Sequence, residues 1–186
     1  GFSQKTLRQW MRAHTGHRSF SVVRHPALRA HRAFCERILG KGPKCYPEIR
    51  RTLRRVHKLP IPKEAPDASW SLEEHRAAFI AFLEFVKANL SDQTAVRADA
   101  AWGSQAGILQ GMGNFALPDF VLREDELEAY LPAVALQVGV AYEAAPPAPA
   151  QDTPYSLEQI YDDEVEARVA EAYQRDYLIF GFNRWR

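Results

Sequence analysis

A strand-to-helix junction near the N-terminus places an arginine where it could bind an anion. Residues 19–34, SFSVVRHPALRAHRAF, run from Val22 and Val23 through Arg24 to Pro26. The β-branched run predicts a buried strand, and Pro26 suits the first turn of a helix because its missing N–H is not needed there. A helix N-terminus offers free N–H groups and a positive dipole end, so Arg24 beside it could hold a phosphate. The alternative is a salt bridge that staples the strand end.

Two further arginines follow on the polar side of the predicted helix. Arg29 could reach the same anion, but its position favours a solvated helix face. Arg32 either points back to the helix start, where it could pair with a phosphate, or faces water. The junction therefore predicts an anion site with Arg24 as its anchor and with Arg29 and Arg32 as further candidates.

The distribution of charge also indicates an anionic ligand for the N-terminal third. The chain has 186 residues, is 46% hydrophobic and carries a net charge of +1, which is typical of one folded domain. Residues 1–63 hold 16 of the 24 Lys and Arg side chains but only two acidic ones, Glu36 and Glu48. Such asymmetry favours an anionic partner, and it is equally compatible with two oppositely charged parts that neutralise each other on folding.

Several classes of protein are excluded by composition. No run of about 18 apolar residues exists to span a membrane, and GFSQKTLRQW lacks the regions of a signal peptide. The two cysteines, Cys35 and Cys45, have neither metal-ligand nor disulfide-framework spacing, so we expect a reducing, cytoplasmic setting. Six histidines include no HxxxH on one clear helix face. Although His25 and His31 could meet, the sequence predicts no metal site.

Helices outnumber strands among the predicted elements. We expect strands over residues 19–23 and 120–122, and helices over residues 5–14, 26–39, 47–58, 71–89, 124–136 and 156–177. Residues 91–116 are expected to be irregular, and residues 143–154 to form a Pro/Ala-rich loop. We expect the centre of the core at the apolar face of the helix over 71–89, with Phe79, Phe82, Leu83 and Val86. Strands followed by helices predict an α/β fold, but two strands are too few for a stable parallel sheet.

The junction resembles the 3′-phosphate-binding motif of sulfotransferases that use 3′-phosphoadenosine 5′-phosphosulfate (PAPS). Arg24, Pro26, Arg29 and Phe34 stand at matching places, whereas Arg32 replaces a serine of the family. Three later segments agree in order, and the resemblance covers residues 17–182. These are DAAWGSQAGIL (99–109), DFVLREDELEAYL (119–131) and LEQIYDDEVEARVAEAYQRDYLIFGF (157–182).

The resemblance to the carbohydrate-type, sulfotransferase family 2-like branch implies a fold and an activity. The fold is a partial P-loop-NTPase-like α/β domain over residues 1–186, helix-rich with few parallel strands. The activity is transfer of a sulfuryl group from PAPS to a hydroxyl or amine of a carbohydrate or small metabolite, with no metal. Arg24, Arg29 and Arg32 are then the candidates for the nucleotide 3′-phosphate.

The same resemblance suggests a substrate cleft and shows two departures. Trp102, Gln105 and His25 are the cleft candidates, although Trp102 suits a plain core position equally well. Ala101 replaces the histidine of the family, so no catalytic base is assigned. The Pro-Lys-x-Gly-Thr loop that grips the 5′-phosphosulfate is absent. We therefore expect an N-terminally incomplete sulfotransferase-like domain, either trimmed or diverged, with little activity by itself.

A second class of function rests on the basic helix over residues 47–58. Arginines or lysine at five of its positions are predicted to face outward and could bind a polyanion such as nucleic acid: Arg50, Arg51, Arg54, Arg55 and Lys58. No aromatic residues interleave with them. This favours a nucleotide co-substrate and a small acceptor over nucleic acid as the partners.

Overall fold

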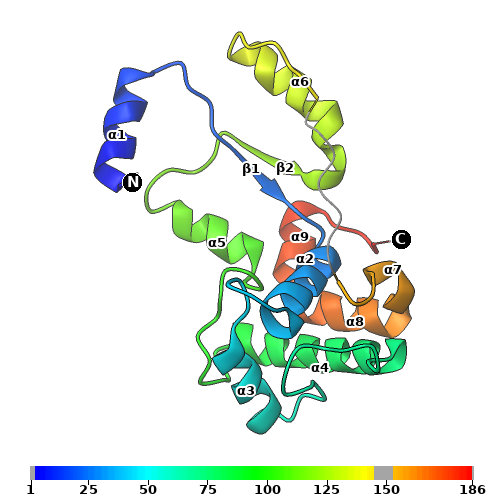
Figure 1. Ribbon diagram of the computed structural model, residues 1–186. Coiled ribbons are helices and arrows are strands. Elements are labelled where there is room, and N and C mark those ends of the chain that lie inside the picture. The colour runs from blue at the N-terminus through cyan, green and yellow to red at the C-terminus, as the bar shows by residue number, and fades with distance from the viewer. Residues whose placement is uncertain (1–2, 145–152, 186) are drawn as a thin grey trace.

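A computed structural model describes residues 3–144 and 153–185 of the chain (Figure 1). The predicted Pro/Ala-rich loop over 143–154 lies mostly outside these residues. The described part is helix-rich with a small parallel sheet, as the coarse α/β prediction requires. Its helices are α1 (Gln4–Ala13), α2 (Pro26–Ala33), the π-helical turn η1 (Phe34–Leu39), α3 (Pro47–Arg55), α4 (Leu72–Leu90), α5 (Gln105–Met112), the short 3-10 turn η2 (Glu124–Glu126), α6 (Leu127–Gln137), α7 (Leu157–Ile160), α8 (Asp163–Ala172) and α9 (Gln174–Phe180).

The sheet consists of β1 (Phe20–Val23) and β2 (Phe120–Arg123), paired in parallel. Phe20 lies opposite Phe120, and Val23 lies opposite Arg123. The expectation that β1 is buried is wrong for most of its length, because Phe20 is 49% exposed and only Val23 is buried. No further strand pairs with either edge of this sheet within residues 3–144 and 153–185.

The core is built around α4, as the sequence predicts. Phe79, Phe82, Leu83 and Val86 are all fully buried. A capping box at Ser71 begins this helix and fixes where its apolar face starts. Helices α2 and α8 pack against one another, and α8 also packs along α4, which brings the N-terminal and C-terminal parts of the chain together (Figure 1).

The single helix predicted over residues 156–177 is in fact three helices. The chain becomes extended at Tyr161, and the carboxylate of Asp162 then accepts a hydrogen bond from the N–H of Val165 at 2.9 Å to begin α8. Arg76 on α4 donates to Asp162 at 2.9 Å and holds this break in place. A second break at Tyr173 separates α8 from α9. The apolar periodicity of the segment did not reveal these tertiary contacts.

The segment predicted to be irregular over residues 91–116 contains α5. Ser104 caps this helix, since its hydroxyl accepts from the N–H of Gly107 at 3.2 Å. Asp176, from the distant helix α9, accepts hydrogen bonds from the N–H groups of Gln105 and Ala106 at 2.9 and 3.0 Å. A helix this rich in glycine is weak by propensity, so the cap supplied from elsewhere in the fold explains its formation.

Helix α3 presents a different face from the predicted one. Arg50 was expected to point outward, but it is buried and donates to the backbone carbonyls of Ile38 and Gly40, the latter at 2.6 Å. Those carbonyls lie where η1 ends and would otherwise lack helical partners. Leu53 is the apolar residue that this helix buries, whereas Val56 at its end is largely exposed.

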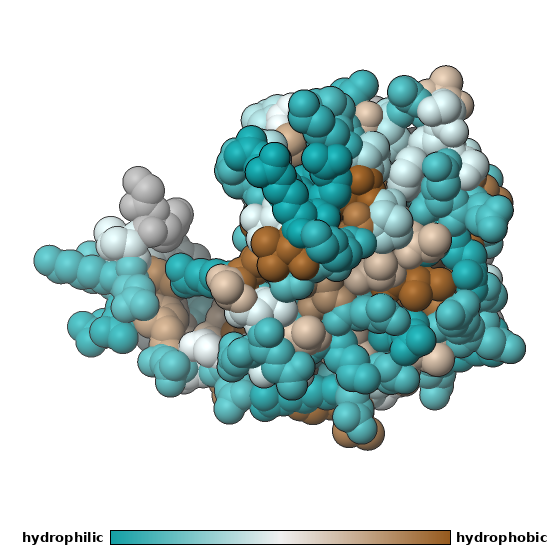
Figure 2. Space-filling view, turned by 90° about the horizontal axis from the view of Figure 1, so that it is seen from below, coloured by the Kyte–Doolittle hydropathy of each residue, from teal (hydrophilic) through white to brown (hydrophobic). Residues whose placement is uncertain are grey.

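Helices α1 and α6 lie outside the core. Neither contains a buried residue, and both project away from α4 at the top of Figure 1. Seen from below, the part that holds α1 extends to the left of the main body, whose surface on this side is largely hydrophilic (Figure 2). Among the described residues, every helix is too short or too polar to cross a membrane.

Candidate functional site

The carboxyl ends of the two parallel strands meet in a charged pair. Arg24 follows β1 and Glu124 follows β2, so the parallel register brings the two residues side by side. The Nε of Arg24 donates to Glu124 at 2.6 Å, and a terminal guanidinium nitrogen donates to the other carboxylate oxygen. The hydrogen bond to this carboxylate raises the pKa of Arg24. Arg24 therefore forms the salt bridge that the sequence left open as the alternative to an anion site.

Gln105 fixes the backbone beside that pair. Its side-chain oxygen accepts from the N–H of Arg24 at 2.9 Å, and its side-chain nitrogen donates to the carbonyl of Arg24 at 2.8 Å. Because Gln105 begins α5 and its own N–H is bound by Asp176, the end of β1 is tied to α9 through two steps. The predicted cleft residue Gln105 is thus a positioning residue, with its amide occupied by the main chain of Arg24.

Arg29 is half-buried, and backbone carbonyls rather than water alone surround its guanidinium. It lies on α2, and its guanidinium donates to the backbone carbonyls of Gly103 and Ala100, in the loop that leads to α5. Burial lowers the pKa of Arg29, and no carboxylate pairs with it among the described residues. A solvated helix face, the simple alternative for this residue, is therefore wrong. Arg29 brings a positive charge to the border between α2 and α5.

These side chains line a pocket of about 540 Å³, which we call the basic pocket. Five cationic side chains border it: Arg24, Arg29, Arg32, Arg37 and Lys44. The two acidic side chains in its lining are Glu36 and Glu124. The excess of positive charge makes this concave surface suitable for binding an anion.

The outer arginines and the lysine of the basic pocket differ in how strongly they are neutralised. Arg32 pairs with Glu36 at 2.8 Å but keeps 41% of its side chain exposed, which leaves it able to meet a ligand. Arg37 donates to the backbone carbonyl of Lys44 at 2.9 Å and lies over the ring of Tyr46. In residues 3–144 and 153–185, neither Arg37 nor Lys44 forms an ion pair with a carboxylate.

His25 lies at the start of α2, on another side of the junction. Its Nδ1 accepts from the N–H of Ala27 at 3.2 Å, and its Nε2 donates to the carbonyl of Asn183 at 2.9 Å. It borders a separate pocket of about 400 Å³ near the C-terminal segment rather than the basic pocket. The structure therefore does not bring His25 together with Arg24 and Gln105 as a cleft. It also shows that one of the N–H groups expected to face a phosphate is already capped.

Trp102 is a core residue. Its side chain is fully buried, and its indole N–H donates to the side-chain oxygen of Asn89 at 2.9 Å. The hydroxyl of Tyr173 donates to the backbone carbonyl of Trp102 at 2.9 Å, so both ends of the residue are held. A place in the substrate cleft is thus wrong for Trp102, and the core position that the sequence allowed equally is correct.

The sequence did not predict a role for Glu124, Arg37 or Lys44 in this region. Glu124 follows the second predicted strand, as Arg24 follows the first. The ends of parallel strands meet at the same edge of a sheet, and that rule could have paired it with Arg24. Arg37 and Lys44 carry no such signal. Residues 40–43 are irregular, so the sequence does not show that the chain turns back and brings Lys44 to the basic pocket.

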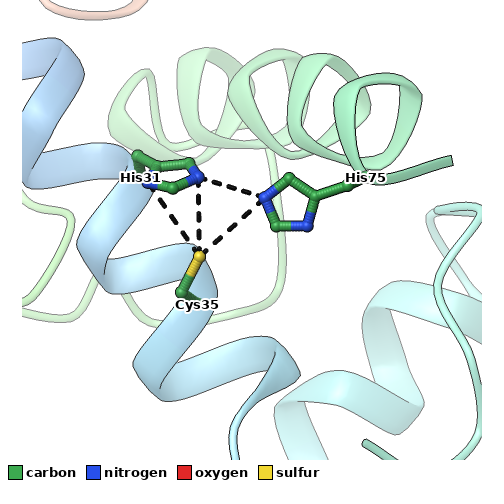
Figure 3. Close-up of side chains that lie close together, drawn as sticks. All are labelled: His31, Cys35 and His75. Carbon is green, nitrogen blue, oxygen red and sulfur yellow. Dashed lines mark hydrogen bonds between the residues drawn. The ribbon is translucent and has the colours of Figure 1, made fainter. Parts of the chain in front are cut away.

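A third arrangement joins the core helices α2 and α4. His31 and Cys35 stand one helical turn apart and point toward His75, which comes from α4 (Figure 3). The Nε2 atoms of the two histidines lie 3.0 Å apart, and the sulfur of Cys35 lies 3.6 Å from Nε2 of His31. The sequence predicted no metal site because its histidines show no HxxxH spacing on one helix face. The His-x-x-x-Cys spacing of His31 and Cys35 is the signal that could have indicated one.

Comparison with known proteins gives no further guide to these sites. No protein-family model, no curated protein and no solved structure matches the chain.

Proposed function

We propose that this chain binds a 3′-phosphorylated adenine nucleotide in the basic pocket and belongs functionally to the PAPS-dependent sulfotransferases. One observation carries the proposal. Five cationic side chains surround a pocket of about 540 Å³ where the two parallel strands end. In open α/β sheets, the crevice beyond the carboxyl ends of the strands is the usual place for a ligand.

Arg24 keeps one part of its guanidinium for a ligand. Glu124 engages Nε and one terminal nitrogen, so the second terminal nitrogen is available to donate to a phosphate oxygen. Glu124 holds the guanidinium in one orientation, and its negative charge also opposes an incoming anion. Arg32 approaches from α2 and Lys44 from the loop after η1, and they supply the charge that outweighs this opposition.

The reaction implied by this class is an in-line transfer. The acceptor oxygen or nitrogen attacks the sulfur of PAPS, and the bond from that sulfur to the 5′-phosphate oxygen breaks. The electron pair stays on the phosphate, which leaves as adenosine 3′,5′-bisphosphate, and the proton of the acceptor passes to a base. Cationic side chains around the nucleotide would stabilise the developing negative charge. The acceptor is a hydroxyl or amine of a carbohydrate or small metabolite, and no residue is assigned as the base.

Calorimetric titration with adenosine 3′,5′-bisphosphate and its 2′,5′ isomer tests the proposal. We expect tighter binding of the 3′,5′ nucleotide. Arg32→Ala and Lys44→Ala should each weaken it about tenfold, since each removes a charge-assisted contact. Arg51→Ala is the matched control, because Arg51 is an exposed arginine of α3 that does not border the basic pocket.

Glu124→Gln provides a test in the opposite direction. Removing the carboxylate that competes with the phosphate should raise affinity for the nucleotide about threefold. The variant should still fold, because a partly exposed ion pair contributes little to stability. Equal affinity for the two isomers, or no loss in either Arg32→Ala or Lys44→Ala, would overturn the proposal.

The polyanion-binding alternative is less well supported by the structure. It rests on a basic helix from which Arg50 has been withdrawn into the core, and Arg51 pairs with Glu48 at 2.7 Å. Heparin and duplex DNA are therefore included in the same titrations. Three results together would show that α3, rather than the basic pocket, is the functional surface. Heparin or DNA would bind tightly, Arg51→Ala would weaken that binding, and adenosine 3′,5′-bisphosphate would not bind.

A further inference from the structure

The His31–Cys35–His75 cluster consists of three side chains that commonly bind metal ions, all of them in the core. Their exposed fractions are 4%, 3% and 0%. Buried side chains of these types normally satisfy their polar atoms through neighbours, and here they turn toward each other (Figure 3). One ligand atom from each residue lies within 4.8 Å of the others.

The separations between these atoms match the edges of a tetrahedral zinc site. Zinc binds nitrogen at about 2.0–2.1 Å and sulfur at about 2.3 Å, which places two nitrogens about 3.3 Å apart and a nitrogen and a sulfur about 3.6 Å apart. The two histidine Nε2 atoms are 3.0 Å apart, and the sulfur of Cys35 lies 3.6 and 4.0 Å from them. The observed separations therefore lie within about 0.5 Å of those in a tetrahedral site.

The backbone presents these ligands from two rigid helices. His31 lies in the last part of α2, and Cys35 lies in the π-helical turn η1 that continues it. Such π-turns within helices occur frequently at functional sites. His75 stands in the first turn of α4, next to the capping box that fixes the start of that helix. The site is therefore positioned by elements that also form the core.

We propose that His31, Cys35 and His75 form a binding site for a divalent cation of the zinc class. The two imidazoles bind through Nε2 and the cysteine binds as a thiolate. Three protein ligands leave one coordination position for water or a small ligand. Cys35 borders a pocket of about 630 Å³ together with Trp70 and Tyr155, which gives that fourth ligand a route of entry. This inference is independent of nucleotide binding in the basic pocket.

The protonation of the cluster sets the chemistry of binding. Burial lowers the pKa of His31 to about 3 and that of His75 to about 4, so both imidazoles are neutral near neutral pH and keep a lone pair. Burial raises the pKa of the Cys35 thiol. The S–H bond must therefore break as the metal–sulfur bond forms, and one proton passes to the solvent for each cation bound.

A hydrogen bond from Trp70 to His75 competes with metal binding and provides a further test. Its indole N–H donates to Nδ1 of His75 at 3.2 Å, and an indole nitrogen can only donate. Nδ1 of His75 is then unprotonated, and its proton sits on Nε2, which donates to His31. Binding through Nε2 moves that proton to Nδ1 and breaks the contact with Trp70. The hydrogen-bonded cluster and the metal-bound cluster are thus mutually exclusive.

Titration of the untagged, chelator-treated full chain with Co²⁺, followed by displacement with Zn²⁺, tests the site. We expect about one Co²⁺ per chain, a thiolate-to-cobalt charge-transfer band, release of about one proton, and loss of the band when Zn²⁺ is added. Cys45→Ser should keep the band. The chain has two cysteines, so the band in this variant can arise only from Cys35.

Two further variants separate a bound metal from a purely structural cluster. Cys35→Ser should abolish the band and weaken Co²⁺ binding by about tenfold or more. Trp70→Phe removes the competing donor and should tighten Co²⁺ binding. The absence of a charge-transfer band in the folded wild-type chain, its loss in Cys45→Ser, or unchanged affinity in Trp70→Phe would overturn the proposal. The first two of these results do not require any core variant to fold.

Discussion

Different forces hold two regions of the molecule in place. One region is the set of helices around α4, and the other, the outer part, is the β1–β2 pair with α1 and α6. Helix α4 buries three phenylalanines, and α2 and α8 pack against the same core. In the outer part, α1 and α6 bury no residue, and the apolar side chains of Phe20 and Val121 remain largely exposed. Burial of apolar surface stabilises the first region, whereas directed polar contacts position the second.

The basic pocket lies where these two regions meet. Arg29 and Arg32 come from α2, which belongs to the core, while Arg24 and Glu124 stand at the strand ends. One link between them is formed by the side-chain amide of Gln105 and the cap that Asp176 provides for α5. A second is formed by Arg123, which donates to the carbonyl of Gly181 at 3.1 Å. One side of the basic pocket, formed by α2, is therefore fixed by the core. The position of the other side, formed by the strand ends, depends on a few hydrogen bonds.

The largest expected difference between the two regions lies in stability. Phe82→Ala removes a fully buried ring from the centre of the core and should lower the free energy of unfolding by about 3–5 kcal/mol. Leu136→Ala on α6 is the matched apolar truncation, at a position that is 80% exposed, and should change it by less than about 0.5 kcal/mol. Urea unfolding of both variants measures these values. Similar losses in the two would show that the outer part is packed as firmly as the core.

A smaller effect is expected where the two regions are joined. Asp176 is fully buried and accepts from the hydroxyl of Ser104 at 2.6 Å as well as from two N–H groups of α5. Asp176→Ala should cost about 3 kcal/mol, since it leaves buried donors without a partner. Asp162→Ala, which removes the more exposed cap of α8, should cost only about 1 kcal/mol.

Hydrogen exchange locates the effect of Asp176→Ala. The amides of Gln105 and Ala106 should exchange faster, and so should the amide of Arg24, because Gln105 holds it. Protection in the middle of α4 should change only as far as global stability changes. If the amide of Arg24 keeps its protection while that of Gln105 loses it, the strand end does not depend on α5.

The sequence predicted the core region well because its signals are local. The capping box at Ser71 and the apolar run after it were sufficient to place α4 and its buried face. Pro26 and Pro47 likewise marked the starts of α2 and α3. The strands were also found, and their small number was correctly expected.

The errors occur where a distant partner decides the structure. The burial of Arg50 depends on carbonyls at the end of η1, and α5 depends on Asp176 from another helix. The family resemblance made Trp102 a cleft candidate, but Asn89 gives its indole N–H a buried acceptor. Periodicity and composition cannot show such pairs, since the two members are far apart in the chain.

The smallest expected effect concerns His25, which stands between the two regions. Burial lowers the pKa of His25, and the hydrogen bond to Asn183 and the charges of Glu166, Arg123 and Asp125 act on it less strongly. Geometry gives the same direction. Nδ1 accepts from the N–H of Ala27, and a proton on this atom would replace an acceptor with a donor.

The consequence for stability follows from proton linkage. As the pH falls below about 6.5, the unfolded chain protonates His25 before the folded chain does, so the free energy of unfolding decreases until the folded protein is protonated as well. His25→Asn retains a capping acceptor for Ala27 but does not titrate. Above about pH 7 the difference in free energy of unfolding between wild type and variant should be constant, and below about pH 6.5 it should shift in favour of His25→Asn. Urea unfolding across this range measures the shift. A constant difference throughout would mean that His25 has the same pKa in the folded and the unfolded chain, and that neither burial nor the contact with Ala27 resists its protonation.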